Sequence, residues 1–310
     1  MNHQPYAPEG TRLAAEQNKA LTETLAGLRA ARDTGTIVEG MAISCDPEHN
    51  LIVELGALRG IIPRTECAIG IASGETREIA ILSRVGKPVC FVVTEAEEGR
   101  IVLSRRLAQE RALAWFLASL RPGDVIPACV THLEPFGAFV DVGCGVVSFI
   151  GIENISVSRI FHPSERFCCG QMIYAAVLST DPAMRRIHLT HRELLGTWAE
   201  NAALFHAGET VRGIVRSIES YGIFIELTPN LSGLAERRSG LHEGEAVSVF
   251  IKSILPDRTK IKLTIIDTLR RPGGPPALHY FIKNGRLDRW VYTPPCCKSK
   301  YVATDFITPP

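Results

Sequence analysis

Residues 136–143 read FGAFVDVG, and residues 221–227 repeat the pattern as YGIFIEL. Both copies keep an aromatic residue, a glycine and a second aromatic residue at the same spacing. Each run continues as a short, mainly apolar segment, as a half-buried β-strand does. Because the aromatic positions repeat with the strand pattern, we expect a repeated binding surface rather than one active site.

The sequence around these runs is also repeated, in three units at residues 35–106, 121–194 and 205–269. In each unit, short stretches of Val, Ile and Phe alternate with polar residues and are separated by Gly, Pro, Asn or Asp. Five such strands in so short a unit favour a small closed barrel, because closure removes exposed strand edges. The predicted fold is therefore all-β: three tandem five-stranded barrels with connecting α-helices.

The remaining segments are predicted to be helical or to follow the last barrel. Residues 1–34 form an N-terminal helical segment, with apolar residues at helical spacing over 11–33, and residues 107–120 form a helical linker. Alternatively, the first helix is a peptide that binds a partner. Residues 270–310 read as a Pro/Gly linker and a basic hairpin tail around Asn284-Gly285, packed on the third barrel or acting as an accessory RNA clamp.

Charge and composition limit the kind of ligand, the kind of site and the location that we expect. The chain has 310 residues and a net charge of +1, and none of the three units is basic; the excess of Lys and Arg lies in the tail. A nucleic-acid ligand would thus be held by base stacking and locally placed cations. The nine cysteines include no C-x-x-C pair, which favours reduced thiols over a metal site. Without an apolar stretch long enough to cross a membrane or a secretory leader, we expect a cytoplasmic protein that does not contact membranes.

The order of motifs in the second unit is the most specific signal. It comprises PGDV, FGAFVDVG, GIENIS, GQM and RIHLT, and it resembles the RNA-binding domain of ribosomal protein S1, an oligonucleotide/oligosaccharide-binding (OB) barrel. The resemblance covers residues 35–269 and implies a short S1-like ribosomal protein that binds single-stranded RNA, in particular mRNA. The alternative is a non-ribosomal RNA-binding regulator, an adaptor for a nuclease, a polymerase or a stress factor.

Exposed aromatic rings are the groups on which RNA bases stack. The candidates are Phe136 and Phe139 in the second unit and Tyr221 and Phe224 in the third. Residues three apart in a regular strand face opposite ways, so the intervening glycine must allow a bulge or a late strand start for both rings to share a face. Alternatively, one ring of each pair belongs to the core.

The resemblance also implies polar RNA contacts. Asn154 follows the third strand of the second unit, and Glu236 takes that place in the third unit, which predicts weaker phosphate binding there. An acidic and a basic residue precede the last strand; the candidates are Asp181 with Arg185 or Arg186, Asp257 with Lys260, and the further cation Lys262. An Asp followed by a basic residue is also common in ordinary hairpins.

The first unit lacks the aromatic pair, since His49 and Ile52 stand in its place, and it carries Glu95, Glu97 and Glu98. We therefore expect the N-terminal region to dock on proteins of the small ribosomal subunit while units two and three hold RNA. The sequence has no Walker loop, G-x-S-x-G motif or acidic cluster, and His188 and His191 lack a third ligand. We expect no enzyme activity, no catalytic residue, no cofactor and no metal.

Overall fold

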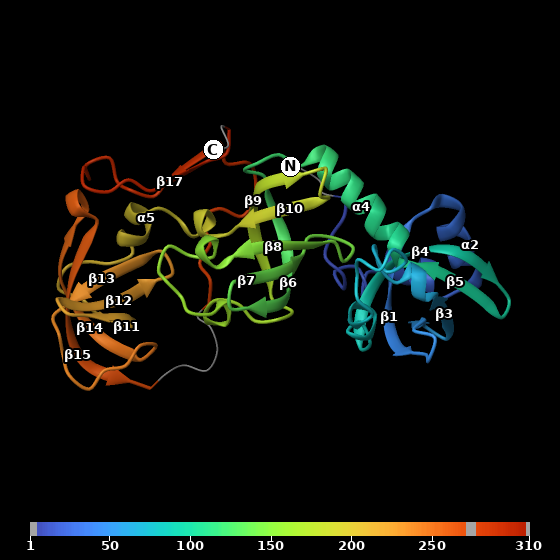
Figure 1. Ribbon diagram of the computed structural model, residues 1–310, viewed down its shortest axis with the longest axis horizontal. Helices are drawn as coiled ribbons and strands as arrows, with labels where there is room; N and C mark the ends of the chain where they lie inside the picture. The colour runs from blue at the N-terminus through green and yellow to red at the C-terminus, as the bar shows by residue number, and fades with distance from the viewer. Residues whose placement is uncertain (1–4, 271–276, 308–310) are drawn as a thin grey trace.

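The computed structural model describes residues 5–270 and 277–307. Three closed five-stranded barrels lie side by side in chain order, with the first and third at opposite ends of the molecule (Figure 1). The predicted all-β fold of tandem barrels with connecting helices is confirmed. Within the described ranges, no helix combines the length and apolarity that a membrane crossing needs.

The first barrel has the strand order β1-β2-β3-β5-β4, and only its β3–β5 pair is parallel. Its strands are β1 (Ile37–Cys45), β2 (Leu51–Leu55), β3 (Leu58–Ile62), β4 (Lys87–Glu97) and β5 (Arg100–Ser104). Between β3 and β4 runs a long segment that contains η1 (Arg64–Glu66) and the one-turn helix α3 (Ile79–Leu82).

The N-terminal helix predicted over residues 11–33 is wrong as a single element. The structure has α1 (Glu16–Thr22) and α2 (Leu25–Thr34), separated at Thr24, whose hydroxyl accepts a hydrogen bond from the Gly27 N–H and caps α2. Leu28 and Ala31 of α2 are fully buried in the core of the first barrel. These helices therefore complete the first barrel.

The middle and third barrels repeat this topology. The middle barrel contains β6 (Val125–Glu134), β7 (Gly137–Asp141), β8 (Val147–Gly151), β9 (Met172–Asp181) and β10 (Arg186–Thr190). The third contains β11 (Thr210–Glu219), β12 (Gly222–Thr228), β13 (Leu231–Ala235), β14 (Ala246–Leu255) and β15 (Lys260–Leu269). In all three barrels the first strand carries a register shift opposite the second strand, between Ala42/Ser44, Val130/His132 and Val215/Ser217.

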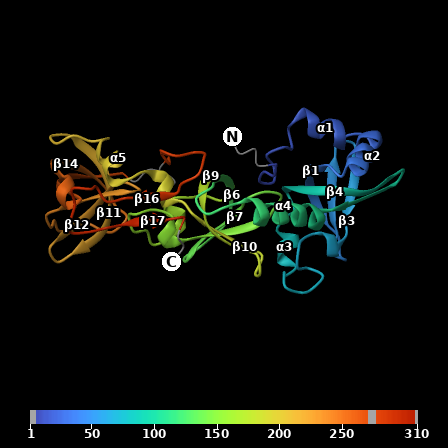
Figure 2. The same ribbon diagram turned by 90° about the horizontal axis from the view of Figure 1, so that it is seen from above.

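Short helical elements connect the strands of the last two barrels. They are η2 (Ile152–Asn154), η3 (Pro163–Glu165), η4 (Arg192–Leu195), α5 (Trp198–Ala202) and η5 (Pro256–Arg258). Helix α4 (Arg105–Ser119) connects the first two barrels and runs across their junction (Figure 2). Its residues Ala112 and Phe116 are fully buried in a core shared with Cys90 and Val92 of β4 and with the middle barrel.

The predicted hairpin at Asn284-Gly285 is wrong. The Gly285 carbonyl accepts a hydrogen bond from Val125 N–H at 3.0 Å, and the Leu287 N–H donates to the Gly123 carbonyl at 2.9 Å. The backbone around this turn thus bonds to the chain that enters β6, and its groups are not available for pairing with residues 280–283. The strands of the tail are instead β16 (Arg289–Val291) and β17 (Ala303–Asp305), which pair with each other.

The tail packs on two barrels, not only on the third as expected. Trp290 and Tyr292 belong to the core of the third barrel, whereas Phe306 packs with Ala176 and Leu194 of the middle barrel. The Tyr292 hydroxyl donates to the buried Asn230 carbonyl at 2.7 Å. Most of the Pro/Gly linker expected at the start of this region, residues 271–276, lies outside the described residues.

Candidate nucleic-acid interface

Three phenylalanine rings form a cluster on the outside of the middle barrel. Phe136 lies just before β7, Phe139 lies on β7, and Phe149 lies on β8. The ring centroids are 6.2 Å apart for Phe136 and Phe139, 5.8 Å for Phe136 and Phe149, and 5.2 Å for Phe139 and Phe149. Phe136 is 57% exposed and the other two rings are half-buried, so each ring is open to solvent.

A hollow of about 440 Å³ opens beside these rings, and we call it the aromatic hollow. Its lining combines the rings with polar groups from the last strand of the barrel. The lining residues are Phe136, Phe139, Val147, Ser148, Phe149, Arg186, Ile187 and His188. Flat apolar faces next to a guanidinium and an imidazole match what a single-stranded nucleotide offers, a base and a phosphate.

Strand alternation explains why these side chains meet. Phe139 is paired with His132 on β6 and with Phe149 on β8, and Phe149 is paired with His188 on β10. Residues paired across a sheet point to the same face, so the four side chains form a row across the barrel. Their immediate neighbours, such as Ala138 and Val140 on β7, point inward and are fully buried.

The two rings of the FGAF run reach one face because β7 begins at Gly137, so that Phe136 lies outside the strand. The register shift lies on β6, between Val130 and His132, and not on β7. A side chain at Gly137 would collide with the Ile150 carbonyl and the Phe149 ring. The glycine therefore allows both the late strand start and the close approach of Phe149.

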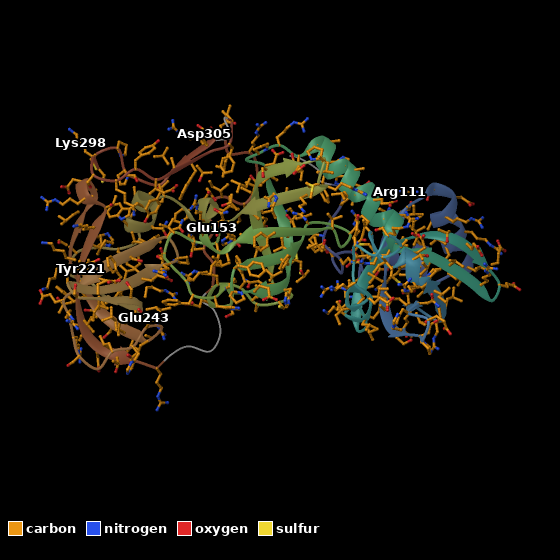
Figure 3. The ribbon with its side chains drawn as sticks, in the orientation of Figure 1. Arg111, Glu153, Tyr221, Glu243, Lys298 and Asp305 are labelled. Carbon is orange, nitrogen blue, oxygen red and sulfur yellow. The ribbon has the colours of Figure 1, made fainter. Side chains whose placement is uncertain are left out.

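The third barrel presents a smaller version of this surface. Tyr221, 67% exposed, projects from the outer face of the barrel, as Figure 3 shows, and its ring lies 6.2 Å from the ring of Phe224. The pairing register places Ser217, Leu234 and Lys262 where the middle barrel has His132, Phe149 and His188. The third ring is thus replaced by Leu234, and the imidazole by the exposed ammonium of Lys262.

The first barrel has neither an aromatic ring nor a cation in the equivalent row, which consists of Ser44, Ile52, Ile61 and Val102. Two of the three acidic residues noted in its sequence, Glu95 and Glu97, bind arginines. Glu97 pairs with Arg29 and Arg32 of α2, at 3.0 and 3.4 Å, and Glu95 pairs with Arg100 at 2.8 Å. Glu97 therefore helps to hold α2 on the barrel.

The polar candidates of the middle barrel take different positions. Arg186 lines the aromatic hollow, whereas Arg185, with a φ of 54°, is exposed and points toward the first barrel. Asp181 accepts the Met184 N–H at 2.9 Å and so closes the β9–β10 turn. Asn154 is half-buried in η2, and its side-chain amide lies 3.4 Å from the Glu153 carboxylate.

In the third barrel, the carboxylate of Asp257 lies 3.5 Å from Arg258 in η5, and Lys260 and Lys262 are exposed on β15. Glu236 forms an exposed ion pair with Lys252 at 3.1 Å. Of the acidic and basic candidates of this barrel, Asp257 thus lies beside the neighbouring arginine, and Lys260 is open to solvent.

Sequence reasoning did not select Phe149, His132 or His188 as contacts in this site. Phe149 could have been found, because it stands between the inward residues Ser148 and Ile150 of a short alternating strand. His188 was considered only with His191, which is fully buried: its Nδ1 contacts the Ile155 carbonyl at 2.7 Å and its Nε2 the Tyr280 hydroxyl at 2.9 Å. Burial lowers the pKa of His191 from 6.5 to about 4. His188 therefore lines the aromatic hollow, whereas His191 lies in the protein interior.

Comparison with known families agrees with the geometry of the middle barrel. Residues 119–192 match the family described as the S1 RNA binding domain, a range that contains all five strands of this barrel. The middle barrel therefore matches the S1 RNA-binding domain family over all of its strands. The aromatic hollow thus lies in the part of the chain that the family match covers.

Curated relatives extend the similarity beyond this domain. The chain is 34% identical over 59% of its length to the small ribosomal subunit protein bS1 homolog of Bacillus cereus, of which it spans 48%. It is 25% identical over 85% of its length to the small ribosomal subunit protein bS1 of Rhizobium meliloti, of which it again spans 48%. It is 28% identical over 78% of its length to the bS1 protein of Staphylococcus aureus, of which it spans 64%. The chain is thus similar to about half to two thirds of longer S1 proteins.

Proposed function

We propose that this protein binds single-stranded RNA on its middle and third barrels and that, like the bS1 proteins it resembles, it holds mRNA on the small ribosomal subunit in the cytoplasm. The observation that carries the proposal is the row of outward-facing rings in the aromatic hollow of an S1 RNA-binding domain. Each base stacked on an aromatic ring contributes about 1–3 kcal/mol. Two such surfaces in one chain give useful affinity without a strongly basic face.

The residues proposed to contact RNA fall into two classes. Bases stack on the four rings named from the sequence, Phe136, Phe139, Tyr221 and Phe224, and on Phe149. Phosphates and base edges meet the polar groups Asn154, Asp181, Arg185, Arg186, Asp257, Lys260 and Lys262 and, in addition, His188. The middle barrel is the stronger site, because the third has Leu234 in place of Phe149 and a carboxylate at Glu236.

Fluorescence polarisation with an unstructured pyrimidine-rich RNA tests the stacking. We expect Phe136→Ala/Phe139→Ala to weaken binding by at least about thirtyfold, the lower end of the range for two lost rings, and Tyr221→Ala/Phe224→Ala to weaken it less. Phe161→Ala is the matched control, since Phe161 is a 51% exposed ring of the same barrel outside the aromatic hollow. Unchanged binding in both double variants would remove the stacking proposal.

Co-sedimentation with small ribosomal subunits separates a translational role from a free RNA-binding or regulatory role. A chain that binds RNA but stays in the supernatant would be a regulator and not a ribosomal protein. The contact with ribosomal proteins is proposed to lie on the N-terminal region. Deletion of residues 1–106 would expose the core beneath α4, so amine-reactive cross-linking of the full chain is the better test. The experiment compares how much Lys19 on α1 and Lys298 on the tail are cross-linked to ribosomal proteins.

A further inference from the structure

The junction between the first and middle barrels is hollow. One cavity there measures about 280 Å³ and a second about 400 Å³, and they share Arg84, Thr131 and Asp141. The first barrel contributes residues of the β3–β4 segment, including Thr76 and Ser83. We call the two cavities together the inter-barrel cleft.

The inter-barrel cleft is continuous with the aromatic hollow. Val147, 62% exposed at the start of β8, lines both the 280 Å³ cavity and the aromatic hollow. The neighbouring arginines at the start of β10 divide between them: Arg186 lines the aromatic hollow, and Arg185 lines the cleft. An RNA strand that extends from the aromatic rings past Val147 therefore enters the cleft directly.

The lining of the cleft suits a phosphate backbone and not bases. Arg185 and Lys87 are exposed there and Arg84 is partly exposed, whereas the hydroxyls of Thr76, Ser83 and Thr131 already donate to backbone carbonyls. All the residues that line the two cavities are aliphatic, polar or charged, so the described lining provides no ring for stacking. Exposed cations without aromatic rings beside them are typical of contacts to the phosphate backbone.

The two acidic residues of the cleft are already bound within the protein. The Glu9 carboxylate accepts hydrogen bonds from Arg105 at 2.7 and 2.8 Å and from the Cys90 N–H at 3.0 Å. The Asp141 carboxylate accepts from the backbone N–H groups of Glu9, Gly143 and Gly145 at 2.7–3.0 Å. Both side chains are almost fully buried, so the exposed charges of the cleft are positive.

We propose that the inter-barrel cleft is a second RNA subsite, which binds the phosphate backbone of the strand whose bases stack in the aromatic hollow. This inference rests on the proposed function. It gives the first barrel a role in RNA binding through its β3–β4 segment and Lys87, although the outer face of that barrel lacks the aromatic row. The site is independent of base sequence, and it is filled only by RNA long enough to extend beyond the aromatic hollow.

The test is the salt dependence of binding for two lengths of oligouridylate, a tetramer and a sixteen-mer. Lys87→Gln/Arg185→Gln removes two exposed cations of the cleft and spares Arg84, whose guanidinium lies 3.5 Å from Glu9 at the junction. Each lost phosphate contact to a single strand lowers the slope of log K against log salt by about 0.7. We therefore expect the slope to fall by about 1.4 with the sixteen-mer and not to change with the tetramer.

Lys19→Gln/Arg59→Gln is the matched control, because it makes the same charge change outside the cleft, at the partly exposed Lys19 and the exposed Arg59. A wild-type slope for the cleft variant with the sixteen-mer, or an equal fall in the control, overturns the inference. If Phe136→Ala/Phe139→Ala still loses affinity in that case, the proposed function stands and only the cleft is refuted. Wild-type protein that binds neither RNA overturns both.

A second measurement needs no change in the cleft. Cys169 is exposed and lines the 400 Å³ cavity, whereas Cys296 is exposed in the tail. In a Cys168→Ser background, we expect saturating sixteen-mer to slow the alkylation of Cys169 at least threefold and to leave Cys296 unaffected, as read by peptide mapping. Equal alkylation of Cys169 with and without the sixteen-mer refutes the subsite, and so does equal protection by the tetramer.

Discussion

Arg166 and Glu226 form a buried ion pair, with 2.5 Å between Nη2 and Oε2, that joins the middle barrel to the third. The side chain of Arg166 is 0% exposed and that of Glu226 is 3% exposed. Arg216 also binds Glu226, at 2.7 Å, and contacts Glu165. Two arginines and two carboxylates thus balance one another at this junction. The side chain of Arg216 is 5% exposed, so it is buried at this junction.

Glu226→Gln should strongly destabilise the chain. The substitution leaves two buried guanidinium groups with one carboxylate, and the loss of one partner from a buried ion pair costs about 3–5 kcal/mol. Urea denaturation measures the change. The control is Glu236→Gln, which removes an exposed ion pair with Lys252 on the same barrel and should leave the midpoint unchanged. Similar midpoints for the two variants would show that the network does not hold the barrels together.

Leu234→Phe should strengthen RNA binding by the third barrel. Leu234 pairs with Phe224 as Phe149 pairs with Phe139, so the new ring would restore the third member of the aromatic cluster. A gained stacking contact contributes about 1–3 kcal/mol, or roughly 5- to 150-fold in affinity. The change is measured by fluorescence polarisation in a Phe136→Ala/Phe139→Ala background.

The reciprocal substitution is the control for this gain. Phe149→Leu in the otherwise unchanged chain should weaken binding by a comparable factor, while the far-ultraviolet circular dichroism spectrum stays the same. If both substitutions leave affinity unchanged, the third position of the row does not contact bases in either barrel.

Trp290→Ala should destabilise the third barrel although Trp290 belongs to the tail. The indole is 4% exposed and lies in the core of that barrel, and truncation of a buried tryptophan costs about 3–5 kcal/mol. Thermal unfolding followed by tryptophan fluorescence measures the effect. A truncation of residues 272–310 would likewise remove core residues, so it cannot test the tail as an RNA clamp.

Substitution of exposed tail cations is the cleaner test of that clamp. Figure 3 shows Lys298 projecting from the tail, and both Lys298 and Lys300 are exposed. Lys298→Gln/Lys300→Gln should leave stability unchanged. A lower salt slope of RNA binding in this variant would support the clamp, and an unchanged slope would contradict it.

The stability of the chain should rise with pH between about 4 and 6.5 because of His191. Burial lowers the pKa of this imidazole from 6.5 to about 4, an effect that nearby Arg166 reinforces and the bond to the Ile155 carbonyl opposes. In this window the unfolded chain binds a proton that the folded chain does not bind, so acid favours unfolding. The slope is at most about 1.4 kcal/mol per pH unit.

Urea denaturation across this pH range measures the effect. His191→Gln should reduce the pH dependence, and His206→Gln, at an exposed position, should not change it. If the His191 variant keeps the wild-type slope, the dependence comes from other groups.

Local patterns were enough to predict the fold class and the aromatic pairs. Strand alternation and turn residues act over a few positions. Because the pattern repeats three times, it favoured a series of barrels over one large sheet. The spacing of Phe136 and Phe139 around Gly137 also indicated either a bulge or a late strand start, and the structure has the late start. The hairpin at Asn284-Gly285 failed for the opposite reason: a good local turn signal was overridden by hydrogen bonds to Gly123 and Val125, far away in the sequence.

The sequence by itself therefore determined the repeated barrel and the positions of the aromatic pairs in the FGAF and YGIF runs, because both depend on neighbours within one or two strands. It left open whether both rings of each pair project from the barrel. Only the tertiary structure decided that Phe149 and His188 join Phe139 in one row, since pairing between strands brings them together. It also decided that Arg216 is buried while Arg185 faces a cleft between barrels. Whether a charged side chain is exposed or paired depends on how the barrels pack against one another. The spacing of residues along the sequence does not specify that packing.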